Sequence, residues 1–302
     1  FTTVMLITAN IYGAYLTKFA ERNLYFDQIL FSKQTEYQKI VFTTSRKFKD
    51  HRLFIDGHNP FSSKDEYRYH EFLVHPSMSI KGKIDNALIL GGGDGLPVRE
   101  VIKYKNVKSI DLVDIDPTMT YLGKNLSILK KINENSLDDK RIKIINEDAF
   151  IFLNQKGKKY DRVIIDLPDP HNEALSKLYS KEFYNIIKKR MNEGAVLVTQ
   201  SSSPFFVKRA FWCINKTLNH VFDQTKPYNI SLPSFGIWGF NLATYKNKIP
   251  ENWNFLVKTK SINSVSMEKS MIFEKDLMKV NVPINTIFQP KLTHLYNQDI
   301  SK

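Results

Sequence analysis

The chain of 302 residues contains one cysteine, Cys213, which excludes a disulfide framework within the chain and fits a reducing compartment. No Cys and His residues have the spacing of metal ligands, and the seven histidines are scattered. The sequence therefore predicts no metal site. Cys213 follows Phe211 and Trp212 in an expected helix, where we interpret it as a small buried hydrophobic side chain.

Basic clusters with interleaved aromatic residues are also missing, although the formal net charge is +13. An excess of positive charge can indicate nucleic acid or an anionic membrane surface. Here the lysines are spread along the chain, and Lys, Asn and Ile are all plentiful, which a nucleotide-level composition bias explains more simply. We therefore predict no nucleic-acid partner.

Residues 1–17 carry no charge, but they are too short for the run of about 20 apolar residues that crosses a membrane. Three interpretations stay open: the end of a truncated membrane helix, a helix on the protein's own surface, and a signal-peptide remnant. Because the chain begins at Phe1 and not at Met, we expect a fragment or a processed product. Lys18, Arg22 and Lys33 follow on the downstream side, which is compatible with a cytoplasmic face.

Strand and helix patterns alternate through the middle of the chain, which predicts an α/β fold with a mostly parallel, Rossmann-like sheet and helices on both faces. A small β-rich domain is expected before it, with strands at 39–43 and 52–55 and a helix at 63–74 capped by Ser62 or Ser63. The four expected segments are a helical segment, the β-rich domain, the Rossmann-like domain and a polar C-terminal appendage: residues 1–32, 33–79, 80–245 and 246–302.

Two carboxylates stand three residues apart in Asp166-Leu167-Pro168-Asp169-Pro170, directly after an apolar run. The two prolines restrict the backbone and prevent a helix from starting there. Open α/β sheets bind ligands at loops of this kind, at the carboxyl ends of parallel strands. Fixed carboxylates suit a cationic substrate or a proton taken from an amine. The alternative is an acidic turn with an N-cap Asp.

Three strand ends upstream are acidic as well. The strand at 87–90 enters Gly91-Gly92-Gly93-Asp94-Gly95, with a helix expected at 96–104. The next strand ends in Asp114, about 20 residues beyond the glycine loop, where nucleotide-binding folds place an acid on the ribose hydroxyls. A third strand runs into Asp148. Acids on successive strand ends together predict a ligand site at this edge of the sheet.

These motifs resemble the polyamine aminopropyltransferases (spermidine synthases), over roughly residues 37–244. The matching segments are Tyr37-Gln38, 53–57, 65–71, 91–95, 114–116, 147–149 and 166–170. Further segments look like the membrane-attached bacterial branch of the family: 177–180, 211–214, 233–236, 238–240 and, less specifically, 282–285 with Pro290 and Leu292.

The resemblance implies aminopropyl transfer from decarboxylated S-adenosylmethionine, a co-substrate, to a polyamine, with release of methylthioadenosine and without a cofactor. It also implies the donor site. Asp94 would face the donor's ammonium group, and Asp114 would accept both ribose hydroxyls. Asp148 and the Ala149 backbone would bind the adenine, and Gln38 would touch the donor.

On the acceptor side, the resemblance implies that Asp166 is the base that takes the proton of the attacking amine. Asp94 and Asp169 would hold ammonium groups, and Tyr69 and His70 would line the amine channel. From the residues alone, His70 would be a helix-face histidine bonded to neighbouring backbone.

Other acids in the matching segments have simpler interpretations. Asp116 would cap a helix starting at Pro117. Asp65 and Glu66 would be acids at the N-terminus of a helix.

The chain departs from the family's pattern in three places. Phe235 stands where many soluble members carry tyrosine, residues 171–174 replace a proline–glycine segment, and Ile237 stands where the membrane branch has an acid. Each departure concerns the acceptor more than the donor. Putrescine is the default acceptor, and a longer polyamine or another diamine stays open. An S-adenosylmethionine-dependent methyltransferase and a non-catalytic polyamine-binding protein stay as alternatives.

The resemblance further implies a preceding membrane domain in the bacterial inner membrane, with the catalytic domain in the cytoplasm, or otherwise a cytoplasmic enzyme. The family also suggests a homodimer.

Overall fold

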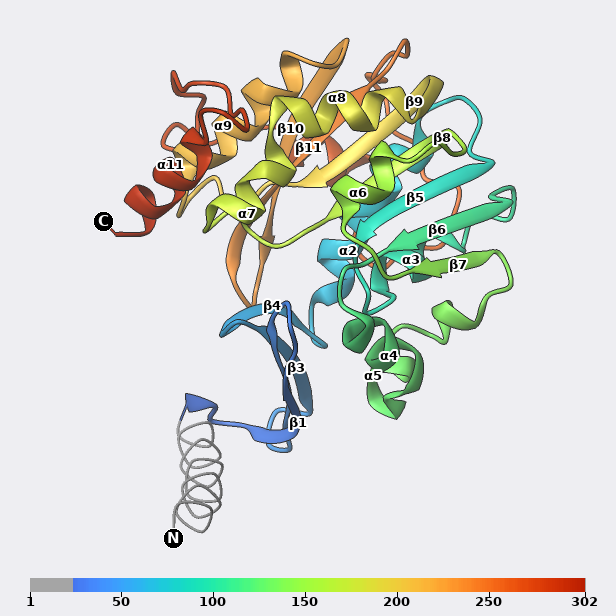
Figure 1. The fold of residues 1–302 in the computed structure, drawn as a ribbon, viewed down its shortest axis with the longest axis vertical. Helices are drawn as coiled ribbons and strands as arrows, with labels where there is room; N and C mark the ends of the chain where they lie inside the picture. Colours follow the sequence, from blue (N-terminus) through green and yellow to red (C-terminus); the bar gives the residue numbers. More distant parts are fainter. Residues whose placement is uncertain (1–23, 302) are drawn as a thin grey trace, which may run out of the picture. The chain divides into compact units, whose positions relative to one another are not determined.

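The computed structural model describes residues 24–301, and the chain divides into two compact units, one up to Lys64 and one from Asp65 onward (Figure 1). The predicted membrane-linked segment 1–17 lies outside the described residues. Within residues 24–301, no helix has both the length and the apolar character to cross a membrane.

The first unit contains a four-stranded antiparallel sheet in the order β1-β2-β3-β4. Its strands are β1 (Gln28–Gln34), β2 (Lys39–Ser45), β3 (Asp50–Ile55) and β4 (His58–Ser62). Phe42 and Leu53 are buried between its elements. The prediction of a helical segment through residue 32 is wrong for residues 28–32. They form β1 because their backbone pairs with β2, a partner that local pattern does not reveal.

The predicted helix at 63–74 is α2 (Glu66–Ser79), and its predicted cap is wrong. Ser62 and Ser63 instead donate their hydroxyls to Asp50 Oδ1, at 2.7 and 3.0 Å. Asp65 occupies the cap position, but its carboxylate accepts the backbone N–H and the hydroxyl of Ser234, at 2.7 and 2.9 Å. The side chains before α2 therefore fix tertiary contacts and leave the helix end uncapped.

The second unit holds a seven-stranded sheet in the order β10-β11-β9-β8-β5-β6-β7. Its strands are β5 (Asn86–Gly91), β6 (Ser109–Val113), β7 (Ile142–Ile145), β8 (Tyr160–Asp166), β9 (Met191–Gln200), β10 (Gln224–Leu232) and β11 (Gly236–Thr244). Strands β5 to β9 pair in parallel, while β11 and β10 add an antiparallel hairpin beside β9. The prediction of a mostly parallel sheet is confirmed.

Helices cover both faces of this sheet (Figure 1). Besides α2, they are α3 (Leu96–Val101), α4 (Pro117–Asn125), α5 (Ser127–Ile132), α6 (Ala149–Asn154), α7 (Glu173–Ser176), α8 (Lys181–Lys189), α9 (Lys208–Asn219), α10 (Ser264–Ser270) and α11 (Lys291–Ile300), with 3₁₀ turns η1 (Ser136–Asp138) and η2 (Lys177–Tyr179).

Two hydrophobic clusters fill the space between sheet and helices. Strand β8 sends Val163 and Ile165 to the face covered by α8, α9 and α11, and Ile164 to the face covered by α2, α3 and α10. This alternation with apolar side chains on both sides is what a central parallel strand requires. Cys213 is fully buried on the first face, as predicted.

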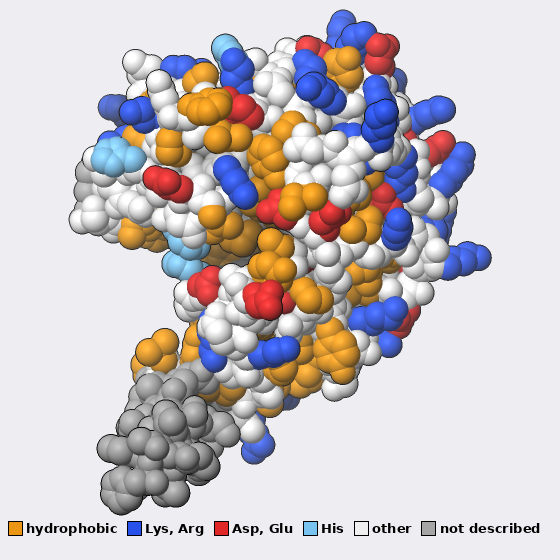
Figure 2. All heavy atoms as spheres, viewed as in Figure 1, with side chains coloured by type: hydrophobic (Ala, Val, Ile, Leu, Met, Phe, Trp, Pro, Cys, Tyr) orange, Lys and Arg blue, Asp and Glu red, His pale blue; other side chains and the backbone are white. Residues whose placement is uncertain are grey.

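The residues after 245 take part in both clusters. Trp253 and Met267 pack on the α2 face, whereas Leu292 and Tyr296 pack on the α9 face. The predicted appendage is thus packed on the sheet domain, and the predicted domain boundaries stay predictions. In the view of Figure 2, Lys and Arg side chains are dispersed, with acidic and apolar side chains between them.

Candidate active site

The carboxyl ends of β5, β6 and β8 bring the predicted acids together. Residues 91–95 leave β5 between the ends of its two neighbours in the sheet. Gly91 pairs with Asp166 across β5 and β8. The Gly93 N–H donates to Asp114 Oδ2 at 2.9 Å. Asp94, inside the same loop, accepts the Leu96 N–H on Oδ1 at 2.9 Å.

The glycines of the loop leave no room for a Cβ, as Gly91 and Gly93 show. A Cβ at Gly91, where φ is +79°, would lie 2.0 Å from the Asp166 carbonyl oxygen. A Cβ at Gly93 would lie 2.6 Å from Asp114 Oδ2. Glycine therefore lets the loop backbone approach both carboxylate-bearing strand ends, which no L-residue with a Cβ could do without displacement.

Asp166 is half-buried at the end of β8, and the Tyr69 hydroxyl donates to its Oδ1 at 2.6 Å. Burial raises the pKa of the Asp166 carboxyl, while the nearby His70 ring and the Tyr69 hydrogen bond act in the opposite direction. A carboxylate with a raised pKa is a better proton acceptor than an ordinary exposed one. The raised pKa and the Tyr69 hydrogen bond are compatible with the predicted role of Asp166 as a base, which stays a prediction.

Asp94 and Asp114 are each about nine-tenths buried. Burial raises the pKa of Asp94 to about 6, with Asp166 adding to the rise and His70 opposing it. Burial also raises the pKa of Asp114 to about 6, although the N–H groups of Asp116 and Gly93 donate to it. A bound cation or further hydrogen-bond donors would stabilise the charged form of both carboxylates.

His70 bonds its neighbouring backbone, as expected from the residues alone, and also joins an ionic network. Its Nδ1 lies 2.8 Å from the Glu66 carbonyl oxygen and 3.0 Å from Glu66 Oε2. Arg99 forms two hydrogen bonds to the same carboxylate, at 2.8 and 2.9 Å, and a third at 2.8 Å to Glu100. Burial opposes a charge on the ring, but Glu66, Asp94 and Asp166 raise the pKa of His70 above its ordinary value.

Asp169 lies in the loop after β8 and does not cap the next helix. Asn172 is the side chain that caps α7. Asp169 Oδ1 accepts the Ser202 hydroxyl at 2.7 Å and the Gln200 amide at 3.4 Å. Asp169 Oδ2 accepts the Tyr296 hydroxyl at 3.0 Å. The side chains of Ser202, Gln200 and Tyr296 thus orient the Asp169 carboxylate.

Asp148 and Ala149 stand at the end of β7, on the same edge of the sheet. The Asp148 carboxylate caps α6 by accepting the Phe150 N–H at 2.7 Å. Lys177 Nζ lies 3.7 Å from its other oxygen. Asp116 caps α4 in the same way, through the Thr118 N–H, as predicted.

Gln38 belongs to the first unit, where its backbone closes a turn with Thr35. The described geometry of that unit does not test its predicted contact with the donor. The structure therefore places Asp94, Asp114 and Asp166 together and puts Tyr69 and His70 beside them. Their roles stay predictions.

Sequence reasoning missed the donors to Asp169. Gln200 is the last residue of β9 and Ser202 follows the strand, so the strand-end rule used for the acids applies to them equally. Phe235 and Trp238 form an aromatic wall with Tyr69, at ring centroid distances of 6.5 Å each. Tyr296 comes from the polar C-terminal segment, where no motif pointed to a site.

Residues 66–256 match the family described as "Spermine/spermidine synthase domain". A polyamine aminopropyltransferase of Leptospira interrogans is 42% identical over 300 residues, 98% of this chain and 59% of the relative. Polyamine aminopropyltransferase 1 of Streptomyces coelicolor is 41% identical over 93% of this chain and 53% of the relative. The chain thus spans somewhat more than half the length of these relatives.

A crystal structure of spermidine synthase from Thermotoga maritima has the same fold, with a TM-score of 0.75 at 24% identity over 83% of this chain and 87% of that chain. The family match covers more than half of the sequence and includes α2, the glycine loop and the Asp166 loop. This chain therefore belongs to the spermine/spermidine synthase family.

Proposed function

We propose that the protein transfers the aminopropyl group of decarboxylated S-adenosylmethionine to a polyamine and releases methylthioadenosine, with putrescine as the default acceptor. The observation that carries this proposal is the cluster of Asp94, Asp114 and Asp166 at one edge of the sheet, where burial raises the pKa of all three. Such a cluster favours a ligand with positive charge and hydroxyl groups. Family membership and the names of the relatives support the same reaction.

The proposed chemistry balances without a further reactant. The lone pair of a neutral amine attacks the aminopropyl carbon bonded to the sulfonium, and the carbon–sulfur bond breaks with its electrons going to sulfur. The sulfonium becomes the neutral thioether of methylthioadenosine, and the new carbon–nitrogen bond leaves a charged nitrogen. Asp166 takes the proton from this nitrogen, and the Tyr69 hydroxyl fixes the carboxylate that receives it.

On the donor side, Asp94 would bind the donor's ammonium group. Asp114 uses both oxygens for backbone N–H groups and still has lone pairs for two ribose hydroxyls. Asp148 and the Ala149 backbone would bind the adenine at the end of β7. Gln38 would add a contact to the donor from the first unit.

On the acceptor side, Asp169 would hold the ammonium group that does not react, and His70 would line the amine channel with Tyr69. Phe235 offers an apolar face in place of a hydroxyl, and Trp238 stands beside it at a ring centroid distance of 5.2 Å. This wall suits the methylene groups of a diamine.

The decisive experiment supplies the protein with decarboxylated or intact S-adenosylmethionine and a panel of amines, with mass spectrometry of the products. We expect an amine enlarged by an aminopropyl group, together with methylthioadenosine. A methylated product would instead indicate a methyltransferase. Amine binding without thioadenosine release would indicate a non-catalytic binding protein, and either result would contradict the proposal.

Membrane attachment through residues 1–17, placement of the catalytic domain in the cytoplasm and formation of a homodimer are further proposals, supported by the resemblance to the membrane-attached branch. Deleting residues 1–23 should release the protein from lipid vesicles and keep turnover within about twofold, because every proposed site residue lies at or beyond Gln38. Vesicle sedimentation with and without these residues tests the attachment. Equal sedimentation of both forms would contradict it.

A further inference from the structure

We propose that Tyr296, on the C-terminal helix α11, is a positioning residue for the acceptor: its hydroxyl holds Asp169 in the orientation that binds the amine. This inference rests on the proposed aminopropyl transfer and extends it to a helix outside the matched family segment 66–256. Tyr296 is 6% exposed, and its hydroxyl donates to Asp169 Oδ2 at 3.0 Å. Burial and the neighbouring Asp169 carboxylate raise the pKa of Tyr296, so the hydroxyl keeps its proton and remains a donor.

Helix α11 is fixed at both ends, which a positioning role requires. At its start, Leu292 is fully buried, and its N–H donates to the side chain of Asn285 at 3.2 Å. Asn285 in turn donates to the Ser176 carbonyl oxygen at 2.9 Å. At its end, the Asp299 carboxylate accepts hydrogen bonds from the backbone N–H and from Nε of Arg209 on α9, at 2.9 and 2.7 Å. Arg209 Nη2 forms an ion pair with the same carboxylate at 2.7 Å.

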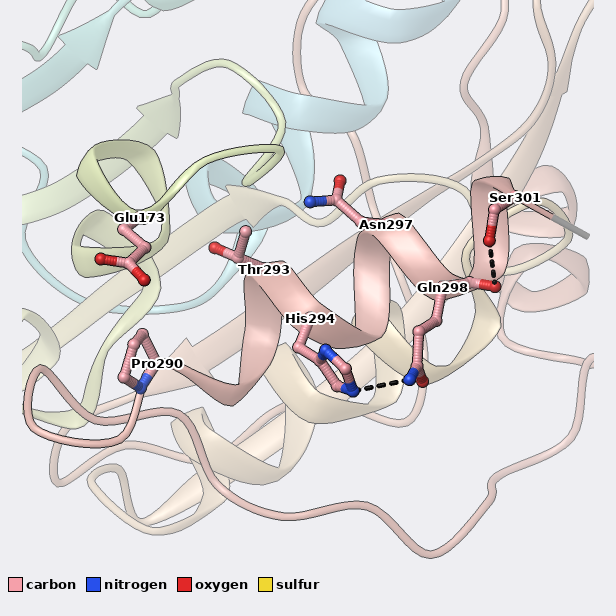
Figure 3. A pocket seen from close by; sticks show the side chains of 7 residues that line it. All are labelled: Glu173, Pro290, Thr293, His294, Asn297, Gln298 and Ser301. Carbon is pink, nitrogen blue, oxygen red and sulfur yellow. Dashed lines mark hydrogen bonds between the residues drawn. The ribbon is translucent and has the colours of Figure 1, made fainter.

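The residues that dock α11 share one face of the helix. Leu292, Tyr296 and Asp299 are four and three positions apart, the spacing of neighbours on one face. The opposite side of α11, with Thr293 and Asn297, lines a surface depression of about 440 Å³ together with Glu173 (Figure 3). That depression contains none of the proposed site residues and is separate from Tyr296.

Helix α11 also contacts the loop that carries Asp169. The Asn297 side chain donates to the His171 carbonyl oxygen at 3.3 Å. One oxygen of Asp169 accepts hydrogen bonds from Gln200, the last residue of β9, and from Ser202, and the other accepts one from Tyr296. Removal of the Tyr296 hydroxyl takes away this hydrogen bond to Oδ2 and weakens the constraint on rotation of the carboxylate. The orientation of the Asp169 carboxylate therefore depends in part on the C-terminal helix α11.

The test compares Tyr296→Phe with the parent in steady-state kinetics for both substrates. Loss of one hydrogen bond predicts a three- to tenfold rise in KM for the diamine. The KM for decarboxylated S-adenosylmethionine and kcat at saturating diamine should stay within twofold. Tyr160→Phe is the matched control, because it removes a buried tyrosine–aspartate bond of 2.6 Å to Asp111 that involves no proposed site residue.

The Asp169→Asn variant, with and without Tyr296→Phe, shows whether Tyr296 positions Asp169 or only stabilises the structure. In an Asp169→Asn background, Tyr296→Phe should change the diamine KM by less than twofold, because the carboxylate that it positions is absent. An equal effect in both backgrounds, an equal rise in donor KM, or an equal rise in diamine KM in Tyr160→Phe would overturn the inference.

The two proposals fail separately. Turnover by the parent protein tests the reaction. The ratio of the diamine KM of Tyr296→Phe to that of the parent tests the role of Tyr296. If the parent shows no aminopropyl transfer, calorimetry still measures the affinity of the parent and of Tyr296→Phe for putrescine, and the two affinities can be compared. A parent that binds no diamine would overturn both.

Discussion

Asp94, Asp114 and Asp166 differ in their partners although they share one edge of the sheet. Asp114 accepts one backbone N–H on each oxygen, from Gly93 and Asp116, and Asp166 is held by the Tyr69 hydroxyl. Asp94 receives a single N–H from Leu96. We expect these environments to suit different tasks, because a carboxylate with several backbone donors favours neutral hydroxyl groups, while one with a single donor attracts a cation.

Asp166→Asn removes the proposed base and keeps the shape of the side chain. We expect turnover at saturating putrescine to fall by about 10²–10⁴, the usual cost of losing a general base. Rapid-quench kinetics with both substrates measures this loss, and calorimetry of methylthioadenosine checks that the donor site is intact. Turnover within threefold of the parent would remove Asp166 from the chemistry.

Asp94→Asn should narrow the preference for decarboxylated over intact S-adenosylmethionine. The decarboxylated donor presents an ammonium group alone, while intact S-adenosylmethionine adds a carboxylate that Asp94 repels. Charges about 4 Å apart interact by roughly 4 kcal/mol at an effective dielectric near 20, and a third of that is about tenfold in affinity. Calorimetry with both ligands on parent and variant gives the ratio. An unchanged ratio would contradict the assignment.

The glycine loop between β5 and α3 is the element on which donor binding depends. Gly93→Ala would place a Cβ 2.6 Å from Asp114 Oδ2, so we expect the loop to shift and donor affinity to fall about tenfold or more. Gly194→Ala is the control, because its φ of +84° makes it strained while its Cβ would meet no atom within 4 Å. The control should lose stability, by about 1 kcal/mol, and keep donor affinity. Equal affinity loss in both variants would show a general effect of strain.

The central strands could be predicted from sequence because strands buried on both faces are continuous apolar runs. β5 and β8 are such runs, and the acids that follow them were found by the same pattern. Strands β1, β4 and β10 were missed, since each lies at the edge of its sheet and mixes polar with apolar residues.

The site was predictable where chain order and sheet order give the same neighbours, as for Asp94 and Asp114 at the ends of β5 and β6. It was not predictable where distant segments meet. Tyr296 and Asp169 are 127 residues apart, and their contact depends on the packing of α11 against α9 and α7. Glu66 is the expected acid in the first turn of α2, and its bonds to Arg99 and His70 were not predicted. A local pattern carries no information about such partners.

Buried acids at the site also affect the whole molecule, because they make its stability depend on pH. The pKa of Asp94 and of Asp114 is about 6 in the folded chain, against 3.8 for an ordinary aspartate. Between these values the native state holds more protons than the unfolded chain. The free energy of unfolding must therefore fall as pH rises from about 4 to above 6. For Asp94 alone this corresponds to ~3 kcal/mol.

Other titratable groups change the free energy of unfolding outside the range from about pH 4 to 6, or they lower it with rising pH as the site carboxylates do. Glu66 and Asp50 have a lowered pKa, so the stability that they contribute is present above about pH 4 and is lost only at lower pH. His70 has a raised pKa, so its contribution is complete below about pH 6.5 and is lost as pH rises further. The fall between pH 4.5 and 6.5 should therefore come from the site carboxylates.

We expect the ligand-free parent to lose several degrees in Tm between pH 4.5 and 6.5, and Asp94→Asn to lose about half as much. Asp276→Asn, which removes an exposed carboxylate, serves as the control and should follow the parent.

Decarboxylated S-adenosylmethionine should raise the Tm more at pH 7 than at pH 5, since the ionised carboxylates bind the cation. Scanning calorimetry of the three proteins across this range measures all of these changes. A parent whose Tm rises from pH 4.5 to 6.5, or an Asp94→Asn variant with the parent's slope, would mean that the buried acids of the site do not hold their protons in the folded state.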